Sequence, residues 1–503
     1  MTLSALLQGW VDSANCPELG VRGLTLDSRQ VEAGFLFCAC HGRDRHGLSF
    51  WEQAVARGAV AVLYDPLGAE KFDLEAVTVP AMALDSLGQK LSAIASRFYG
   101  HPSHHLGVIT VTGTNGKTTV CQAIAQVLTL QNHRQVGVMG TLGNGVWGAL
   151  ESTGLTTADA ITVQRQLAGM VAEGVKDVVL EISSHALDQG RVAALRYQVA
   201  IFTNLSRDHL DYHHTIEAYA AAKRGLFASR SLRWAVINYG DPIGRRWCDE
   251  LEGTMNLIRY GFVGADIVER GLDLAATKLA LTPQGFSFEV RSRWGSGRID
   301  SPMLGAFNAE NLLAALGGLI ATGMNFTLAL NLLGQVEGVA GRMERVTASG
   351  VGDAPTVVVD FAHTPDALQK AIVACRGHGF ETITVLFGCG GDRDRGKRPE
   401  MGAVAEAEAD QLVITSDNPR SEPPEAIMDD ILRGLKRPDA ARVVVDRREA
   451  IASTLATLPR DPRQLLLVAG KGHERYQEIA GVRHPYSDFS EIGQALARLR
   501  GGA

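Results

Sequence analysis

Long apolar runs are missing from this chain of 503 residues. No stretch approaches the ~18 consecutive apolar residues that a membrane-spanning helix needs, so we expect no membrane span. The amino-terminal sequence MTLSALLQGWVDSANC lacks both a basic segment and a long apolar segment, and it therefore does not resemble a signal peptide. We predict a cytoplasmic protein.

Cysteines are few and scattered. The chain has seven, and the closest pair, Cys38 and Cys40 in FCAC, has C-x-C rather than C-x-x-C spacing. No second pair lies at the spacing of a zinc site, so we interpret all seven as reduced thiols rather than as disulfide partners or metal ligands.

Basic clusters, internal repeats and low-complexity tracts are also missing. The net charge is −6 without a block of lysine or arginine, which argues against a nucleic-acid partner. With 46% hydrophobic and 21% charged residues, the composition is that of an ordinary globular protein. The length is too great for one hydrophobic core and indicates two to four domains.

Strands and helices alternate through most of the chain, which predicts an α/β fold with parallel sheets. We predict three domains: an N-terminal α/β domain at 1–100, a central domain with a mostly parallel sheet at 101–338, and a Rossmann-like C-terminal domain at 339–503. The segment ATKLALTPQGFSFEVRS (276–292) instead alternates as antiparallel strands do around a turn at 283–285.

The central domain begins with a phosphate-binding loop. An apolar strand leads into GTNGKTT (113–119) and then into an amphipathic helix, although the loop is shorter between its glycines than the common P-loop pattern. Small residues let backbone N–H groups surround phosphate oxygens, and the start of a helix adds a positive dipole. Lys117 is predicted to reach the β- and γ-phosphates, and Thr118 to offer its hydroxyl to Mg²⁺.

A P-loop by itself leaves a kinase, a GTPase, an ATPase motor and a ligase open. Glu181, at the end of the strand DVVLE, is the candidate second Mg²⁺ ligand, with a solvated strand-end carboxylate as the alternative. A further polar stretch, FTNLSRDHLDYHH, places His209 after a strand and Lys223 in the helix that follows. By its spacing alone, this stretch equally fits a loop with ordinary surface polarity.

Several motifs in this order resemble the Mur ligases, ATP-dependent amino-acid ligases that build the peptide stem of peptidoglycan during bacterial growth and division. They span the three predicted domains and read TGTNGKTT, EISSHAL, TNLSRDHLDYH, AAKRGLF, LGAFNAEN, GRME, DFAHTPD, GCGGDRDRGKRP and AGKGHE. The resemblance implies a UDP-sugar-binding N-terminal domain, a central ATPase domain, and a C-terminal domain that binds the incoming amino acid.

The resemblance also implies two Mg²⁺ ions, the second held by His209 and by a carbamate formed from CO₂ on Lys223. Carbamate formation requires a neutral amine, so the site must lower the pKa of Lys223. Two cations suit a reaction that brings the carboxylate and phosphate anions together.

The remaining substrate contacts follow from the same resemblance. ATP is expected to meet Gly113, Thr114, Asn115, Gly116, Lys117, Thr118, Thr119, Asn308, Asn311, Arg342, Asp360 and His363. Of these, Arg342 and Asp360 would reach ATP only when the domains close. The alternative for Arg342 and Glu344 is an interdomain salt bridge. The UDP-linked sugar dipeptide is expected to meet Leu26, Ser28, Arg43, Asp44, Arg45, Thr156, Thr157, Ser183, Gln189 and Arg191.

The turn SDNPRSEPP (416–424) places a carboxylate, an amide and a guanidinium around one proline after an apolar strand. In the family, D-N-P-R marks the members that add meso-2,6-diaminopimelate, whose two zwitterionic ends suit such groups. The predicted amino-acid pocket contains Arg393, Asp417, Asn418, Pro419, Arg420, Gly470 and Glu474. The alternative is a proline turn in which an Asx-type hydrogen bond caps the next helix.

These residues predict a ligase that acts through an acyl phosphate and forms ADP and phosphate. We expect it to bind only small molecules and to be a monomer. Three alternatives remain: a lysine-adding ligase of the same family, a folylpolyglutamate-type ligase, and a P-loop ATPase that performs no ligation.

Overall fold

The computed structural model describes residues 1–12, 16–42, 45–132, 134–151, 154–264, 271–346 and 355–501. The chain forms two compact units, Met1–Arg259 with Gly317–Met324, and Tyr260–Leu316 with Asn325–Ala503. The predicted α/β class is confirmed, whereas the exact boundaries of the three predicted domains stay predictions.

The N-terminal part of the first unit is a parallel sheet of four strands in sequential order. One face of the sheet packs against α1 and α3, and the other face packs against α2. Both faces are apolar because successive side chains along each strand point to opposite faces of the sheet. The elements are β1 (Gly23–Thr25), β2 (Phe35–Ala39), β3 (Ala59–Tyr64), β4 (Ala81–Ala83), α1 (Leu3–Leu7), α2 (Trp51–Ala56) and α3 (Leu87–Phe98).

The first unit also contains strands in the order β11-β10-β5-β9-β6-β7-β8. The pairs from β11 to β6 are parallel, and β7 and β8 add an antiparallel edge. The strands are β5 (Gly107–Thr112), β6 (Val136–Gly140), β7 (Gly143–Val146), β8 (Ala149–Glu151), β9 (Asp177–Glu181), β10 (Val199–Phe202) and β11 (Trp234–Asn238).

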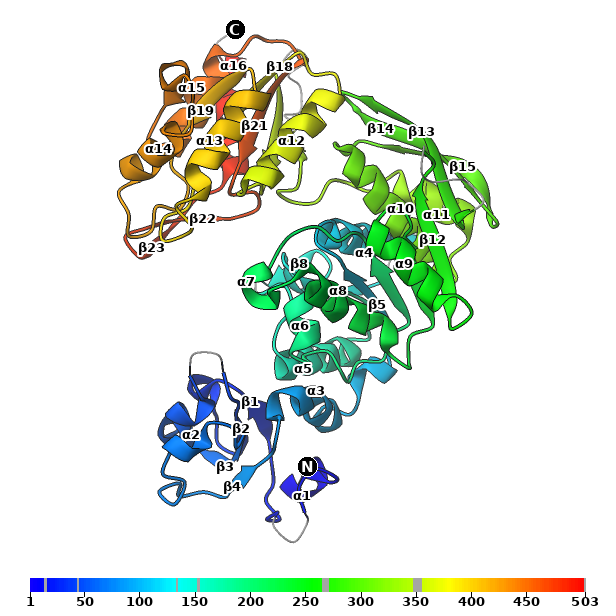
Figure 1. Ribbon diagram of the computed structural model, residues 1–503, viewed down its shortest axis with the longest axis vertical. Helices are drawn as coiled ribbons and strands as arrows, with labels where there is room; N and C mark the ends of the chain where they lie inside the picture. The colour runs from blue at the N-terminus through cyan, green and yellow to red at the C-terminus, as the bar shows by residue number, and fades with distance from the viewer. Residues whose placement is uncertain are drawn as a thin grey trace. The chain divides into compact units, whose positions relative to one another are not determined.

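The helices of this part connect its parallel strands (Figure 1). Several begin at a side-chain cap; Asp159, for example, accepts from two backbone N–H groups of the first turn of α5. They are α4 (Lys117–Asn132), α5 (Ala160–Ala172), α6 (Ser184–Asp188), α7 (Leu210–His213), α8 (Ile216–Arg224) and α9 (Pro242–Leu251).

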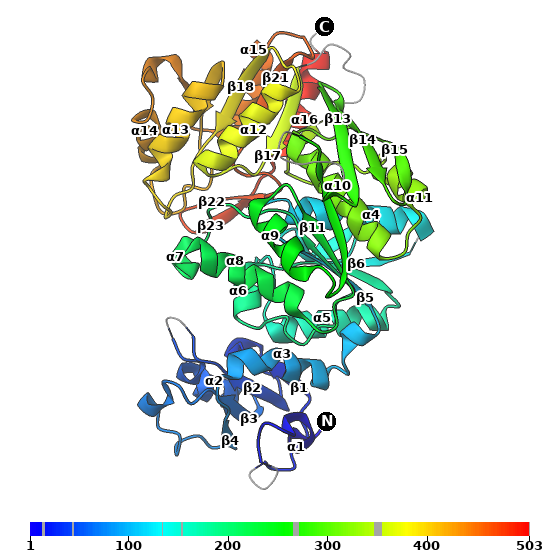
Figure 2. The same ribbon diagram turned by 45° about the vertical axis from the view of Figure 1, so that its right-hand side comes forward.

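The second unit begins with a ribbon in which β13 pairs antiparallel with β14 and β14 with β15, as predicted (Figure 2). The turn at 283–285 joins β13 to β14, also as predicted. The elements are β12 (Asn256–Phe262), β13 (Leu274–Thr282), β14 (Gly285–Ser292), β15 (Gly295–Ser301), α10 (Ala306–Ala321) and α11 (Phe326–Leu333).

The C-terminal sheet has the order β16-β17-β21-β18-β19-β20, with β16 antiparallel and the other pairs parallel. Alternate strand residues face α12, α13 and α14 on one side and α15 and α16 on the other (Figure 1). The strands are β16 (Glu344–Val346), β17 (Thr356–Asp360), β18 (Thr382–Phe387), β19 (Gln411–Ile414), β20 (Arg442–Val443), β21 (Gln464–Ala469), β22 (Tyr476–Ile479) and β23 (Val482–Pro485). The helices are α12 (Pro365–Gly377), α13 (Lys397–Glu408), α14 (Pro424–Leu432), α15 (Arg447–Thr457) and α16 (Asp488–Gly501).

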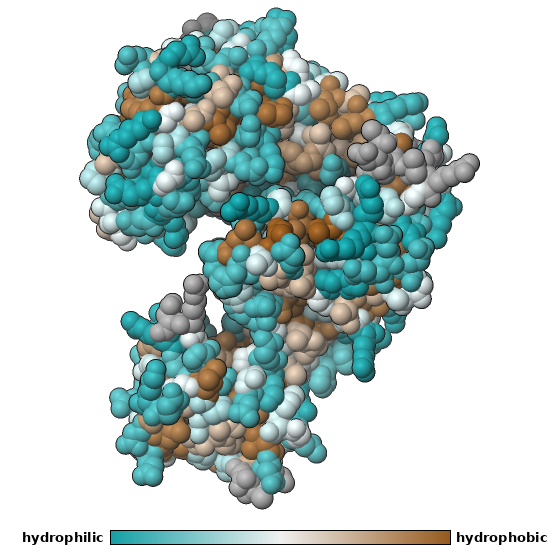
Figure 3. Space-filling model, viewed as in Figure 1, coloured by the Kyte–Doolittle hydropathy of each residue, from teal (hydrophilic) through white to brown (hydrophobic). Residues whose placement is uncertain are grey.

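The surface and the cysteines agree with an ordinary globular chain. On the face shown in Figure 3, hydrophilic residues predominate around smaller groups of hydrophobic ones. All seven cysteines are free thiols, as predicted. Among the described residues, none of the helices combines the length and apolar character of a membrane span.

One buried ion pair joins α15 to α16. The guanidinium of Arg447 donates to both carboxylate oxygens of Asp488 at 2.8 Å, and both side chains are fully buried. The hydroxyl of Tyr486 also donates to Asp488, at 2.8 Å. The pair therefore satisfies two charges that would otherwise lie unpaired in the core.

We expect Asp488→Asn to lower the free energy of unfolding by about 3–5 kcal/mol, because it leaves the Arg447 charge buried without a counter-ion. Chemical denaturation followed by circular dichroism measures the change. Asp300→Asn, which removes the exposed partner of Arg298, is the control and should leave stability unchanged. An equal effect of the two substitutions would contradict the role of burial.

Candidate active site

The predicted phosphate loop joins β5 to α4. Gly113 has φ +147°, and a Cβ atom there would lie 2.0 Å from Oγ1 of Thr203, so the position requires glycine. Asn204, just beyond β10, accepts from the backbone N–H of Thr114 at 2.8 Å and of Asn115 at 3.0 Å. The end of a neighbouring strand thus fixes the loop at the start of α4.

Two lysine side chains meet at one carbonyl of this loop. Lys117 Nζ and Lys223 Nζ each donate to the carbonyl oxygen of Gly113 at 2.9 Å, and Lys117 also donates to that of Thr114 at 2.8 Å. Burial, and secondly the charge of Lys117, hold the pKa of Lys223 well below its ordinary value. The environment therefore favours a neutral amine at Lys223.

Tyr219, which we did not predict, lies against both predicted ligands of the second metal. Lys223 Nζ lies 4.6 Å from its ring centroid, and the ring centroid of His209 lies 6.0 Å away. Burial raises the pKa of Tyr219 to about 12, so its hydroxyl, 3.2 Å from Thr114 Oγ1, remains protonated. Its place one helical turn before Lys223 on α8 is the signal that could have identified it.

His209 precedes α7 in a left-handed conformation, with φ +54°. Its half-exposed side chain places Nε2 3.5 Å from Asp208 Oδ2. The ring of His185 lies 4.9 Å from it, and burial together with the neighbouring histidines lowers the pKa of His185. His209 is therefore the accessible imidazole of this cluster.

Glu181 ends β9 and links the phosphate loop to a second group of polar residues. Its Oε2 accepts from the hydroxyls of Thr118 at 2.9 Å and Thr141 at 3.1 Å, and its Oε1 accepts from the Thr141 N–H at 3.0 Å. Glu181 is buried, so the alternative of a solvated strand-end carboxylate is wrong. Thr141, whose Oγ1 also lies 3.1 Å from Thr156 Oγ1, was not predicted, although it follows a strand end.

Four of the predicted sugar-peptide residues are also joined. Thr157 Oγ1 donates to the Glu181 carbonyl at 2.9 Å and accepts from the Ser183 N–H at 3.1 Å. Arg191 donates to the Thr157 carbonyl at 2.9 Å and, through two nitrogens, to Gln189 Oε1 at 2.6 and 3.0 Å. Thr157 follows β8 and Ser183 follows β9, whereas Gln189 and Arg191 lie at and just after the end of α6. The group adjoins the phosphate loop through Glu181.

The residues of the N-terminal sheet that are predicted to bind the sugar dipeptide are not joined to one another by hydrogen bonds within the described residues. Ser28 is buried in the 3-10 turn after β1, and its hydroxyl donates to Gln53 Oε1 at 2.6 Å. Leu26 is half-buried and Arg45 is exposed. Arg43 and Asp44 lie outside the described residues, so their roles stay predictions.

Asn308 and Asn311 are buried on α10. Asn308 Nδ2 donates to the Leu304 carbonyl at 2.7 Å, and Asn311 Nδ2 donates to Asn308 Oδ1 at 3.0 Å. Both amide groups are therefore already oriented by the protein.

Arg342 precedes β16 and Asp360 ends β17, two neighbouring strands of the C-terminal sheet. The Arg342 guanidinium lies 4.9 Å from the ring centroid of Phe361, and its Nε is buried without a hydrogen-bond partner in the described chain. Asp360 accepts from the N–H groups of Met343 at 2.7 Å and Ala362 at 2.8 Å, while burial raises its pKa.

Glu344 Oε2 accepts from the Gly341 N–H at 2.7 Å. The alternative for Arg342 and Glu344, an interdomain salt bridge, stays a prediction. His363 is exposed, with Nδ1 2.8 Å from the Phe361 carbonyl.

The turn after β19 is buried, with Asp417 8% and Asn418 3% exposed. Asn418 Oδ1 accepts from Lys471 Nζ and from the Glu478 N–H, both at 2.9 Å, and Asn418 Nδ2 donates to Glu474 Oε2 at 2.8 Å. Helix α14 begins after Pro423 without a side-chain cap, so the alternative of an Asx cap is wrong.

The other residues of the predicted pocket surround this turn. Arg420 has φ +51°, donates from Nη1 to the Gly391 carbonyl, and places Nε 3.8 Å from Glu478 Oε2. A Cβ atom at Gly470, whose φ is +111°, would lie 2.6 Å from Asp417 Oδ2. Pro419 lies between Asn418 and Arg420, and Arg393 is exposed on the loop after β18.

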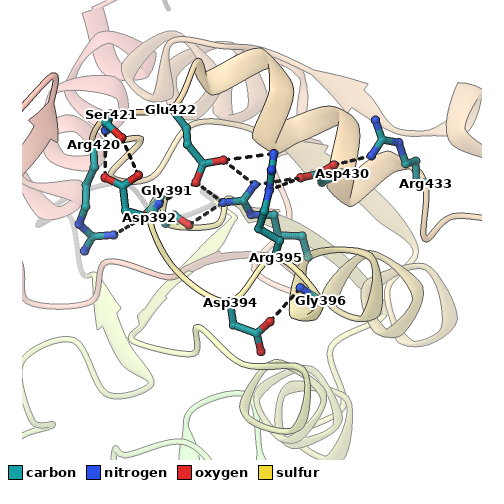
Figure 4. A network of polar contacts seen from close by, with 12 residues as sticks. Gly391, Asp392, Asp394, Arg395, Gly396, Arg420, Ser421, Glu422, Asp430 and Arg433 are labelled. Atoms are coloured by element: carbon teal, nitrogen blue, oxygen red, sulfur yellow. Dashed lines mark hydrogen bonds and ion pairs between the residues drawn. The ribbon is translucent and has the colours of Figure 1, made fainter.

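A polar network ties that loop to the turn (Figure 4). Asp392 accepts from the Ser421 hydroxyl at 2.6 Å, and the Asp392 N–H donates to Glu422 Oε1 at 2.7 Å. The buried guanidinium of Arg398 donates to both oxygens of Glu422, whose pKa falls to about 2. Arg398 belongs to the motif GCGGDRDRGKRP, but the sequence alone did not predict a role for it.

Comparison with protein families matches three segments of the chain. Residues 20–99 match "Mur ligase family, catalytic domain", residues 111–319 match "Mur ligase middle domain", and residues 341–472 match "Mur ligase, glutamate ligase domain".

Individual relatives match nearly the whole chain. The UDP-N-acetylmuramoyl-L-alanyl-D-glutamate–2,6-diaminopimelate ligase of Pseudomonas aeruginosa is 48% identical over 95% of this chain and 96% of its own length. The ligase of the same name from Alkalilimnicola ehrlichii is 42% identical over 100% of both chains. A solved structure with that enzyme name is 35% identical, covers 99% of both chains, and has a TM-score of 0.72.

The likeness to that solved structure confirms the predicted three-part α/β fold. Because the relatives and the three family matches together cover nearly all of its length, this chain belongs to the Mur ligase family.

Proposed function

We propose that the protein is an ATP-dependent ligase that joins meso-2,6-diaminopimelate to the γ-carboxylate of the D-glutamyl residue of UDP-N-acetylmuramoyl-L-alanyl-D-glutamate, in peptidoglycan precursor synthesis. The names of relatives up to 48% identical support this function. The observation that carries it is the turn at 417–420, where the buried Asn418 donates to Glu474 and lies between the carboxylate of Asp417 and the guanidinium of Arg420 in the sequence.

The unused hydrogen-bonding groups of this turn suit an amino acid. Asn418 retains one amide N–H, and no hydrogen bond to Glu474 Oε1 is found in the described chain. Arg420 uses Nη1 for the Gly391 carbonyl and retains further donors. Carboxylate acceptors beside guanidinium donors match a ligand end that carries both an ammonium group and a carboxylate.

We propose that ATP binds the loop at 113–119 and that Lys117, now held on two loop carbonyls, turns to the β- and γ-phosphates. Asn308, Asn311, Arg342, Asp360 and His363 are the further proposed contacts. The unpartnered Nε of Arg342 supports an anionic ligand at that residue, because a buried donor without an acceptor is costly.

The residues of the first unit suit Mg²⁺. Thr118 and Glu181 present two hard oxygen donors 2.9 Å apart, and Mg²⁺ prefers oxygen ligands. Among the described residues, no three His, Cys, Asp or Glu side chains gather as a metal site. We propose Thr118 and Glu181 for one ion, and His209 with carbamylated Lys223 for the second; when bound, they neutralise phosphate charge.

The carbamate on Lys223 is supported by its surroundings. The amine is 1% exposed, and its hydrogen-bond acceptor, the Gly113 carbonyl, also accepts from the ammonium group of Lys117. A neutral amine in this position is the form that reacts with CO₂.

The sugar dipeptide is proposed to bind Leu26, Ser28, Arg43, Asp44, Arg45, Thr156, Thr157, Ser183, Gln189 and Arg191. The connection of Thr156 and Thr157 to Glu181 supports a dipeptide carboxylate close to the phosphate loop. We further propose a monomer located in the cytoplasm.

The reaction then proceeds in two transfers. The D-glutamyl γ-carboxylate attacks the γ-phosphorus of ATP, and ADP leaves with Lys117 opposing the growing charge. The amine of diaminopimelate, held by the 417–420 turn and Glu474, attacks the acyl phosphate, and phosphate leaves from the tetrahedral intermediate. Positioning and charge neutralisation supply the acceleration, without a covalent enzyme intermediate.

Phosphate release with purified enzyme tests the function. We expect release that depends on UDP-N-acetylmuramoyl-L-alanyl-D-glutamate and on diaminopimelate, with mass spectrometry identifying the tripeptide product. Preference for lysine would support the lysine-adding alternative. Failure to bind the UDP-linked dipeptide would support a folylpolyglutamate-type ligase, and full ATP turnover without an amino acid would support an ATPase.

We expect Lys223→Ala to reduce kcat by at least about 10²-fold, because the proposed anionic ligand is lost. Magnetic resonance with isotopically labelled bicarbonate should show one carbamate signal in the wild type and none in the variant. Lys176→Ala, which removes an exposed lysine of the same unit, is the control. An unchanged carbamate signal in Lys223→Ala would show that the modification lies elsewhere.

We expect Gly470→Ala to raise the KM for diaminopimelate by about tenfold or more while the KM for ATP stays nearly constant, because the new methyl group would displace the Asp417 carboxylate. Gly481→Ala is the matched control, since its φ of +77° imposes similar backbone strain with no atom within 4 Å. Equal effects of the two substitutions would assign the change to strain alone.

A further inference from the structure

Lys471 lies behind the proposed amino-acid pocket and has no role in the reaction above. It follows β21, and its side chain is 0% exposed. Its ammonium group donates to Asn418 Oδ1 and to Glu474 Oε2, both at 2.9 Å. The ring centroids of Tyr476 and Tyr486 lie 5.7 and 5.8 Å from Nζ, so aromatic faces enclose the charge on other sides.

The chemistry of the ammonium group fixes how Asn418 is oriented. An ammonium group donates hydrogen bonds and cannot accept them, so the amide must turn its oxygen toward Lys471. The Glu478 N–H reinforces this choice by donating to the same oxygen at 2.9 Å. The amide nitrogen therefore faces Glu474, and its second N–H is left for a ligand.

Lys471 also sets the charge of the pocket. Glu474 accepts from Asn418, and the ion pair with Lys471 offsets the charge of Glu474. Without Lys471 the same pocket would carry an additional uncompensated negative charge. Such a pocket attracts a cation and repels a carboxylate.

We propose that Lys471 is a positioning residue that determines amino-acid specificity, because it orients Asn418 and offsets the charge of Glu474. The pocket then accepts a ligand whose far end carries both an ammonium group and a carboxylate, and disfavours one whose far end is purely cationic. Because its ammonium group is enclosed, Lys471 acts through these two side chains and not by contact with the ligand. This inference rests on the proposed function.

The experiment compares diaminopimelate with L-lysine as substrates of the full-length enzyme. Lys471→Met keeps the volume and removes the charge. We expect kcat/KM for diaminopimelate to fall and the ratio of kcat/KM for lysine to that for diaminopimelate to rise, each by about tenfold or more.

Lys370→Met, which removes an exposed lysine of the same unit, is the control and should leave the ratio unchanged. Should Lys471→Met not fold, Lys471→Gln, which retains hydrogen-bond donors without the charge, provides the same comparison. An equal loss for both amino acids, with an unchanged ratio, would show a merely structural role and overturn the inference. Wild-type enzyme that uses neither amino acid would instead overturn the proposed function.

Discussion

The proposed chemistry depends on one constraint of parallel sheets: their strands end at a common edge, where loops and helix amino termini also meet. The phosphate loop follows β5, Glu181 ends β9, and Asn204 follows β10, which pairs with β5. In the second unit, the residues after β18, β19 and β21 meet in the same way around Asn418. Residues far apart in the chain thereby become hydrogen-bonded neighbours.

Buried cations are held in this chain in three different ways. Arg447 faces a carboxylate that is as deeply buried as itself, and the pair serves stability. Lys471 divides its hydrogen bonds between an amide and a carboxylate, which orients both groups. Lys223 shares a carbonyl acceptor with a second lysine, an arrangement that disfavours its charge. These three buried side chains therefore have different roles, and the groups that accept their hydrogen bonds decide which role each one has.

Several residues of the proposed sites have an unusual backbone conformation. Gly113, His209, Arg420 and Gly470 all have positive φ values, and each adjoins a residue proposed to bind a substrate or metal. At the two glycines, neighbouring polar atoms leave no room for a side chain. The close approach of backbone to polar groups at these points is what a pocket for phosphate or carboxylate groups requires.

The sequence alone determined the alternation of strands and helices, the antiparallel ribbon, and the P-loop, because these depend on local periodicity and on residue types close together in the chain. It also indicated which motifs carry the chemistry. It did not identify Tyr219, Thr141 or Lys471 as partners of those motifs, and it left open an Asx cap at the 417–420 turn. Only the tertiary structure decided these contacts, because a hydrogen bond between residues such as Asn418 and Lys471 depends on how separate strands pack together, which no local pattern encodes.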